Sequence, residues 1–172
     1  MHESSNIVEK QGWRHPSKIP AGGNGNSPNG QNWVNPTDEQ LMRACRRKGK
    51  KLDHSDKSMV AAIHGEVLEK TWRAIMEYEN LHIGCIQPTL SRFEGKSEVL
   101  SPKAKFYSKP FDRHDWVVDR CGKEVRYIID YYGGDFNPSS PFNGKLIVDC
   151  RPALTLGGVF DRLHLNFKKA FL

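Results

Sequence analysis

The sequence contains no long apolar run. None of its hydrophobic stretches approaches the roughly 20 residues that a helix needs to cross a bilayer, so we expect no transmembrane helix. The first residues contain neither the apolar centre of a secretory signal nor an Arg-rich amphipathic presequence. A mitochondrial location stays open, because some proteins enter mitochondria without a cleaved signal.

Closely spaced cysteines are also lacking. The four cysteines, Cys45, Cys85, Cys121 and Cys150, form no Cys-x-x-Cys pair. A closed zinc site usually draws on such pairs, so the sequence gives little support for structural zinc. We expect four separate thiols, buried or half-buried, although two disulfides are compatible with the count.

Size and charge set wide limits. The chain has 172 residues, of which 37% are hydrophobic and 27% charged, values that are ordinary for a globular protein. That length allows one domain with a modest core, with or without a tail. The net charge of +6 favours anionic partners, such as nucleic acid, acidic lipid or an anionic ligand, but it does not choose among them.

The N-terminal region is poor in apolar residues. Residues 1–31 are rich in Gly, Asn, Ser and Pro, and residues 20–31 have almost no apolar side chain. Such a stretch buries too little surface to offset the entropy of ordering it. We therefore predict a flexible arm over residues 1–31, in which residues 13–20 can dock locally, followed by one domain over residues 32–172.

Three segments have the pattern of helices. Residues 38–48 follow Thr37, which can form a capping box with Gln40, and Gly49 ends the helix. Residues 58–82 give the strongest helical signal, and residues 156–172 form a closing helix. The apolar stripe of the second helix consists of Val60, His64, Leu68, Thr71 and Ile75, and that of the third consists of Leu156, Val159 or Phe160, Leu163 and Phe167.

Residues 113–132 have the pattern of a β-hairpin. Residues 115–119 and 125–132 are β-prone, and Cys121-Gly122 lies between them at the turn. Residues 146–150 have the composition of a third strand. We therefore predict an α+β fold, in which a small antiparallel sheet, made of the hairpin and the third strand, is packed with several helices.

His64 lies in the middle of an apolar helical stripe. A histidine in this position is more often part of a core than a ligand. The functional alternative is an axial ligand to haem iron, because haem needs an apolar slot into which one imidazole points. Glu69 lies five residues further on, roughly 140° round the helix, and can line one wall of a pocket or remain a solvent-facing charge.

The segment 111–116 combines aromatic and ionisable residues. His114 stands between two aspartates, which suits acid–base work or metal binding, and equally suits a polar strand edge. Guanidinium groups hold carboxylates in bidentate fashion, so Arg113, Arg120 and Arg126 suit haem propionates, and they suit phosphate equally well. Tryptophan rings can stack on a porphyrin or pack in a core; the candidates are Trp33, Trp72 and Trp116, of which we assign Trp72 to the core.

Several longer motifs carry a resemblance to a known family. The most specific are PFDRHDWVVDRCGKEVRYIIDYY, residues 110–132, and VDCRPAL, residues 148–154. Shorter ones are Trp33-Val34-Asn35-Pro36, Ile63-His64 followed by Glu69-Lys70-Thr71-Trp72, Tyr78-Glu79 with His82, and Ser101-Pro102-Lys103-Ala104. In these motifs, over residues 33–167, the chain resembles the holocytochrome c synthase (cytochrome c haem lyase) family.

The resemblance implies a function. It implies a lyase that is peripheral on the inner mitochondrial membrane, faces the intermembrane space and binds ferrous haem b as its substrate. The enzyme would join the haem vinyl groups, through two thioether bonds, to the Cys-x-x-Cys-His cysteines of apocytochrome c or c1. Two features depart from the family: no cysteine here precedes a proline, and the stretch between Ala104 and Pro110 is several residues shorter.

The resemblance also implies a site. His64 would be the axial iron ligand and, with Glu69 in support, would act in catalysis. Trp33 would lie at the haem, and His114 and Arg120 would contribute to binding it. Arg113 and Trp116 join this set on chemical grounds only.

Three other functions fit parts of the sequence. A haem carrier or sensor would share all the haem-binding residues and would lack only the transfer step. A nucleic-acid-binding module fits the charge and the aromatics, but no motif of that class is present, and we expect no nucleic-acid partner. A zinc hydrolase that uses His114 lacks paired ligand spacing.

Overall fold

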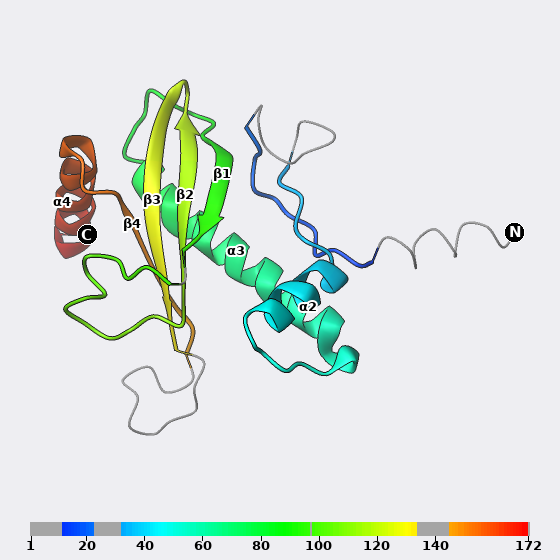
Figure 1. Ribbon diagram of the computed structural model, residues 1–172. Helices are drawn as coiled ribbons and strands as arrows, with labels where there is room; N and C mark the ends of the chain where they lie inside the picture. Colours follow the sequence, from blue (N-terminus) through cyan, green and yellow to red (C-terminus); the bar gives the residue numbers. More distant parts are fainter. Residues whose placement is uncertain (1–11, 23–31, 97, 134–144, 172) are drawn as a thin grey trace, which may run out of the picture.

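The structure, a computed structural model, describes residues 12–22, 32–96, 98–133 and 145–171. One antiparallel sheet, in the order β1-β2-β3-β4, carries α3 across one face and α4 beside β4 (Figure 1). This arrangement confirms the predicted α+β fold. The elements are α2 (Asp38–Arg47), the 3-10 turn η1 (His54–Asp56), α3 (Lys57–Glu79), β1 (Thr89–Gly95), β2 (Asp112–Arg120), β3 (Lys123–Tyr132), β4 (Ile147–Pro152) and α4 (Leu156–Phe171).

The hairpin and the third strand are confirmed. β2 and β3 pair in register around Cys121 and Gly122, which both have positive φ, 50° and 93°. Two successive residues with positive φ match the twist of the flanking strands, as in a type I′ turn. β1 was not predicted: its sequence, TLSRFEG, lacks a regular alternation, and its pairing with β2 is interrupted between Leu90 and Arg92.

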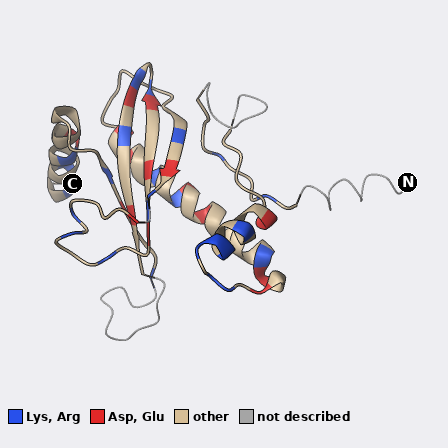
Figure 2. Cartoon of the chain, viewed as in Figure 1, with Lys and Arg blue, Asp and Glu red and all other residues tan. Residues whose placement is uncertain are grey.

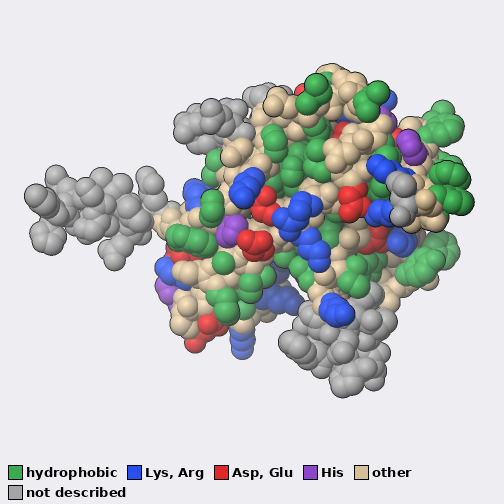
Figure 3. Space-filling view, turned by 180° about the vertical axis from the view of Figure 1, so that it is seen from behind, with side chains coloured by type: hydrophobic (Ala, Val, Ile, Leu, Met, Phe, Trp, Pro, Cys, Tyr) green, Lys and Arg blue, Asp and Glu red, His purple; other side chains and the backbone are tan. Residues whose placement is uncertain are grey.

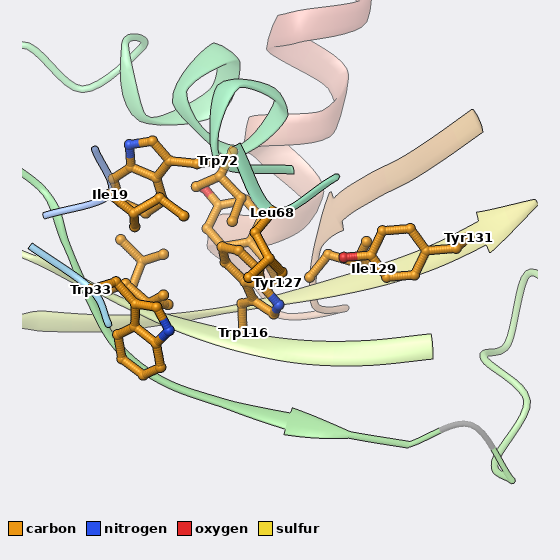
Figure 4. Packing of buried hydrophobic residues seen from close by; sticks show 11 residues of the cluster. Ile19, Trp33, Leu68, Trp72, Trp116, Tyr127, Ile129 and Tyr131 are labelled. Carbon is orange, nitrogen blue, oxygen red and sulfur yellow. The ribbon is translucent and has the colours of Figure 1, made fainter. Parts of the chain in front are cut away.

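The core lies between α3 and the sheet. Leu68 and Trp72 of α3 pack against Trp116 of β2 and against the side chains of β3 that face the helix, which are Tyr127, Ile129 and Tyr131 (Figure 4). Thr71 is also buried there and its hydroxyl lies 3.0 Å from the Tyr131 hydroxyl. The predicted capping box of α2 is present, since Thr37 and Gln40 each accept a hydrogen bond from the other's backbone.

The described part of the predicted arm, residues 12–22, packs against the domain. Ile19 is 0% exposed, its carbonyl accepts a hydrogen bond from the Trp33 amide at 2.8 Å, and the Pro20 carbonyl accepts one from the Leu90 amide at 2.7 Å. The docking that the sequence allows for residues 13–20 is therefore what the structure shows. The rest of the predicted arm, residues 1–11 and 23–31, lies outside the described residues.

The arm segment also makes one very close approach to α3. The His15 ring lies directly over Gly65, and a Cβ atom at position 65 would overlap that ring. Glycine is therefore required at this point of the helix by packing. The imidazole of His15 also lies 3.4 Å from the Glu66 carboxylate.

α4 has the predicted bounds but the opposite orientation. The predicted stripe suggested that Leu156, Phe160, Leu163 and Phe167 would pack inward, yet all four side chains are exposed. The face that packs against the domain consists of Gly158, Asp161 and Leu165. The reason is electrostatic: Asp161 bonds to Arg120 of the sheet and to His82 of the segment after α3, and these bonds hold that side of the helix inward.

Two of the four cysteines form a disulfide, so the expectation of four separate thiols was wrong for this pair. Cys85, after α3, is joined to Cys121 of the hairpin turn, 36 positions later. Cys45 and Cys150 are free thiols. Among the described helices, none is both long enough and apolar enough to span a membrane.

Candidate functional site

A cavity of about 510 Å³ lies between α3 and the sheet. Its volume is in the range of pockets that hold cofactors and small ligands. Most of its wall is apolar, and two imidazoles enter it, one from the helix and one from the sheet. The lining residues are Lys50, Val60, Ile63, His64, Val67, Leu68, Phe111, Asp112, His114, Tyr131, Gly133 and Leu146.

His64 enters the cavity from α3. Its Nδ1 atom is buried and has no hydrogen-bond partner in the described part of the chain. Burial, assisted by the nearby His114, lowers the pKa of His64 to about 4. The ring is therefore neutral at physiological pH and keeps a lone pair, which is the form that binds haem iron.

His114 enters the same cavity from β2. Its ring meets Phe93 edge-on at 5.9 Å and Tyr131 at 5.6 Å between centroids. Its Nδ1 atom is buried, again without a partner among the described residues, and burial lowers its pKa. The cavity thus holds two neutral imidazoles whose hydrogen-bonding capacity is incompletely used, which is unusual for buried polar groups.

Charged side chains lie at one end of the cavity. Lys50 and Asp112 both line it, and the Lys48 ammonium lies 3.3 Å from the Asp112 carboxylate. Figure 2 shows Lys and Arg gathered on α2 and in the loop that follows it. Sequence reasoning missed Lys50 as a site residue, although the basic run at the end of α2 was a signal for an anionic group nearby.

Arg113 lies on the opposite face of the sheet. Its guanidinium donates to Asp115 at 3.0 Å and to the Val99 carbonyl at 2.6 Å. It lines a separate, more polar cavity of about 690 Å³, together with Arg126. Neighbouring residues of a strand point to opposite faces, so Arg113 cannot share the cavity of His114.

Arg120 lies at the far end of β2, in a buried ion-pair network. Its guanidinium donates to the Glu79 carboxylate at 2.7 and 3.0 Å and to Asp161 at 3.2 Å, and Tyr127 donates to Glu79 at 2.6 Å. Burial alone would lower the Arg120 pKa, but the bonds to Glu79 outweigh it and raise the pKa. These contacts occupy the guanidinium, and Arg120 does not line the cavity of His64.

Trp33 and Trp116 stand behind the cavity wall. Both are buried in the core cluster, and both rings pack on Phe93, at 5.2 and 5.9 Å between centroids. Phe93 in turn touches His114. The two tryptophans therefore support the sheet side of the cavity and do not line it.

Glu69 connects the helix to the arm segment. Its carboxylate accepts hydrogen bonds from the Ser17 hydroxyl at 2.9 Å and from the Lys18 amide at 3.0 Å. It does not line the cavity that His64 enters. The zinc-hydrolase alternative finds no ligand set, since the described residues contain no cluster of three His, Cys, Asp or Glu side chains suited to a metal ion.

The sequence matches known proteins over most of its length. The model of the "Cytochrome c/c1 heme lyase" family matches residues 3–87 and 80–166. A "Probable holocytochrome-c-type synthase" of Caenorhabditis elegans is 40% identical over 152 residues, which cover 80% of this chain and 54% of that protein. The "Holocytochrome c-type synthase" of Homo sapiens is 42% identical over 147 residues, or 77% and 54% of the two chains.

A "Putative holocytochrome-c1 synthase" of Schizosaccharomyces pombe is also similar, with 35% identity over 141 residues, which cover 78% of this chain and 64% of that protein. The chain thus spans about half the length of the relatives in Caenorhabditis elegans and Homo sapiens. No solved structure matches it.

Proposed function

The chain belongs to the cytochrome c/c1 heme lyase family, and on that basis we propose that it is a holocytochrome c synthase. In this proposal it binds ferrous haem b as a substrate and promotes attachment of the two vinyl groups to the cysteines of a Cys-x-x-Cys-His segment. The partner is apocytochrome c or c1, because similar proteins carry both names.

The observation that carries this proposal is the cavity shared by His64 and His114. A largely apolar slot between a helix and a sheet suits the face of a porphyrin, and a neutral imidazole suits its iron. Both imidazoles line this slot, and neither buried Nδ1 atom has a hydrogen-bond partner among the described residues, which supports a role for the rings beyond packing. Lys50 and the α2 loop supply positive charge at one end for carboxylates such as propionates.

The proposed chemistry is addition of a thiol across a vinyl group. Sulfur bonds to the vinyl carbon next to the ring, the terminal carbon gains a proton, and the S–H and C=C π bonds are lost, so no oxidant or reductant is needed. His64 would hold the iron from one side while the substrate histidine approaches from the other. Alignment of two reacting groups in one complex then supplies much of the rate, and the bond from His64 must remain breakable for release.

The remaining site residues receive supporting roles in this proposal. Trp33 and Trp116 would hold Phe93 and thereby the ring of His114, and Glu69 would fix the arm segment against α3. Arg120 would join the sheet to α3 and α4 at a distance from haem. Arg113 faces the other side of the sheet, and we assign it no contact with haem.

We also propose where the protein works: at the intermembrane-space surface of the inner mitochondrial membrane, as a peripheral protein. The family membership and the basic net charge support this location. Cardiolipin and other anionic lipids would attract a chain with a net charge of +6.

The proposal can be tested by co-expression with apocytochrome c in a bacterium that lacks a c-type maturation system. After denaturation, haem that stays on the cytochrome with the wild type but not with His64→Ala supports a synthase that uses His64. His54→Ala is a matched control, because His54 is exposed and does not line the cavity.

Two other outcomes would overturn the proposal. A Soret band on this protein without covalent product would favour the carrier function. If neither a Soret band nor a covalent product formed, the basic surface would be the remaining functional feature. Salt-dependent binding of an oligonucleotide would then indicate a nucleic-acid-binding module.

A further inference from the structure

The exposed face of α4 is almost entirely apolar. Five large side chains recur at spacings of three and four residues, so they lie on one side of the helix: Leu156, Phe160, Leu163, Phe167 and Phe171, each between 62% and 85% exposed. In Figure 3, hydrophobic side chains protrude along the edge of the molecule where the turned view places α4. Single exposed apolar residues are common, but a continuous face of this size marks an interaction surface.

The cations of α4 lie on one flank of that face and on the inward side. At about 100° per residue, His164 and Lys168 fall on one flank of the apolar face, whereas Arg162 and Lys169 lie further round, beside the side that packs against the domain. The single acidic residue of the helix, Asp161, lies on the buried side, where it bonds to Arg120 at 3.2 Å and to His82 at 2.9 Å. Beside the apolar face, α4 therefore carries the Lys168 cation and no acidic side chain.

The inward side of α4 is fixed independently of any partner. Asp161 connects it to β2 and to the segment after α3, and Arg162 donates to the Pro152 carbonyl at 2.9 Å. Lys169 pairs with Glu77 of α3 at 2.5 Å. These contacts at both ends hold the helix in one orientation, so its apolar face cannot rotate into the core.

We infer that α4 is the membrane-binding element of this protein, and that it lies in the surface of an anionic phospholipid bilayer with its apolar face among the acyl chains. A helix with aromatic and leucine side chains on one face and basic side chains beside that face follows the pattern of interfacial helices, which bury the apolar face and place their cations at the phosphates. The charge favours an anionic lipid surface over a neutral one. The inference deepens the membrane partner named in the proposed function and does not depend on haem transfer.

The inference is tested by flotation of the full chain with lipid vesicles. We expect binding to vesicles of phosphatidylcholine mixed with phosphatidylglycerol, weak binding to phosphatidylcholine alone, and loss of binding as salt is raised. The double variant Leu163→Gln/Phe167→Gln should weaken binding by about tenfold or more, because the lost apolar contacts contribute directly to insertion. Lys168→Glu should weaken binding to the anionic vesicles only.

The matched control is Ile83→Gln/Ile86→Gln, which removes two other apolar side chains, 95% and 90% exposed, from a loop outside α4. It should bind vesicles like the wild type. Equal losses in the control and the α4 variant, or no vesicle binding by the wild type, would overturn the inference. Dimerisation that the α4 variant abolishes, without vesicle binding, would assign the face to a second copy instead.

The vesicle test separates this inference from the proposed synthase. Circular dichroism of each variant checks that helix content is unchanged, as expected for exposed positions. Covalent haem attachment by a protein that ignores vesicles would refute the membrane role of α4 alone. Vesicle binding by a protein that never forms a thioether would refute the synthase alone.

Discussion

Arg120 of β2 and Glu79 of α3 form a bidentate ion pair, with nitrogen–oxygen distances of 2.7 and 3.0 Å. The Arg120 side chain is 9% exposed and that of Glu79 is 1% exposed. A pair this deeply buried costs much desolvation, and its value shows mainly when one partner is removed. The pair lies where the last turn of α3 meets the sheet and α4, so it connects three elements.

Replacement of Arg120 by Ala should therefore lower the free energy of unfolding by about 3 kcal/mol, because Glu79 would stay buried without its counter-charge. Urea denaturation measures this change. The double variant Arg120→Ala/Glu79→Gln should recover part of the loss, since position 79 no longer carries a buried charge. If Arg120 instead binds a haem propionate, as the sequence suggested, Arg120→Ala should lower the affinity for haem and leave the free energy of unfolding unchanged.

Glu69→Ala should release the arm segment from α3, because the carboxylate of Glu69 accepts hydrogen bonds from Ser17 and Lys18. We expect faster tryptic cleavage after Lys18 and a loss of about 1–2 kcal/mol in stability. Glu69→Gln keeps one acceptor oxygen and should retain most of the protection. Glu77→Ala, on the same helix, is the control, because Glu77 pairs with Lys169 of α4 and not with the arm segment. Loss of haem attachment in Glu69→Gln with normal protection would instead show that Glu69 acts in the chemistry.

Stability should fall as the pH drops from about 6.5 toward about 4. Burial lowers the pKa of His64 from 6.5 to about 4, so between these values the unfolded chain binds a proton that the folded chain does not. Protonation then favours unfolding, and the stability is fully present above pH 6.5. We expect roughly 1–2 kcal/mol less stability at pH 5 than at pH 7 from this group.

Urea unfolding at the two pH values should show a smaller difference for His64→Gln than for the wild type. His114, whose pKa burial also lowers, should contribute a further part that only the double variant removes. An unchanged pH dependence in His64→Gln would show that the ring is charged or solvated in the folded protein.

Reduction of the Cys85–Cys121 disulfide, or Cys85→Ser, should destabilise the protein by about 3–4 kcal/mol, since the bond closes a loop of 36 positions. The midpoint of thermal or urea unfolding with and without a reductant measures the effect. Cys45→Ser is the control, because Cys45 is a free thiol. Equal unfolding midpoints with and without reductant would show that the bond adds nothing to the folded state.

Local patterns predicted most of the fold. The helices at 38–48 and 58–82, the hairpin turn at Cys121-Gly122 and the third strand follow from caps, periodicity and turn residues, and all are present. β1 could not be predicted because its pairing is irregular and its sequence is mixed. The sequence could not predict which side of α4 packs against the domain. An apolar stripe shows that one side of the helix is hydrophobic, but it does not show whether the domain has a complementary surface to cover that side.

The candidate site was predicted in part. The apolar stripe indicated His64, and strand alternation would have separated His114 from Arg113, since adjacent strand residues face opposite sides. The partners of Arg120 and Glu69 come from segments 41 and 52 positions away. No local pattern encodes such contacts, so the sequence motif drew attention to these residues without showing what they touch.

The contact between His15 and Gly65 restricts the routes by which this protein can change. Any side chain at position 65 would collide with the imidazole of residue 15, so a first step at 65 yields a chain that cannot dock its arm segment. A first step at 15, to a smaller residue, opens the space and makes a later alanine at 65 acceptable. Of the two orders in which the same pair of substitutions can arise, only one passes through an intermediate whose arm segment is docked.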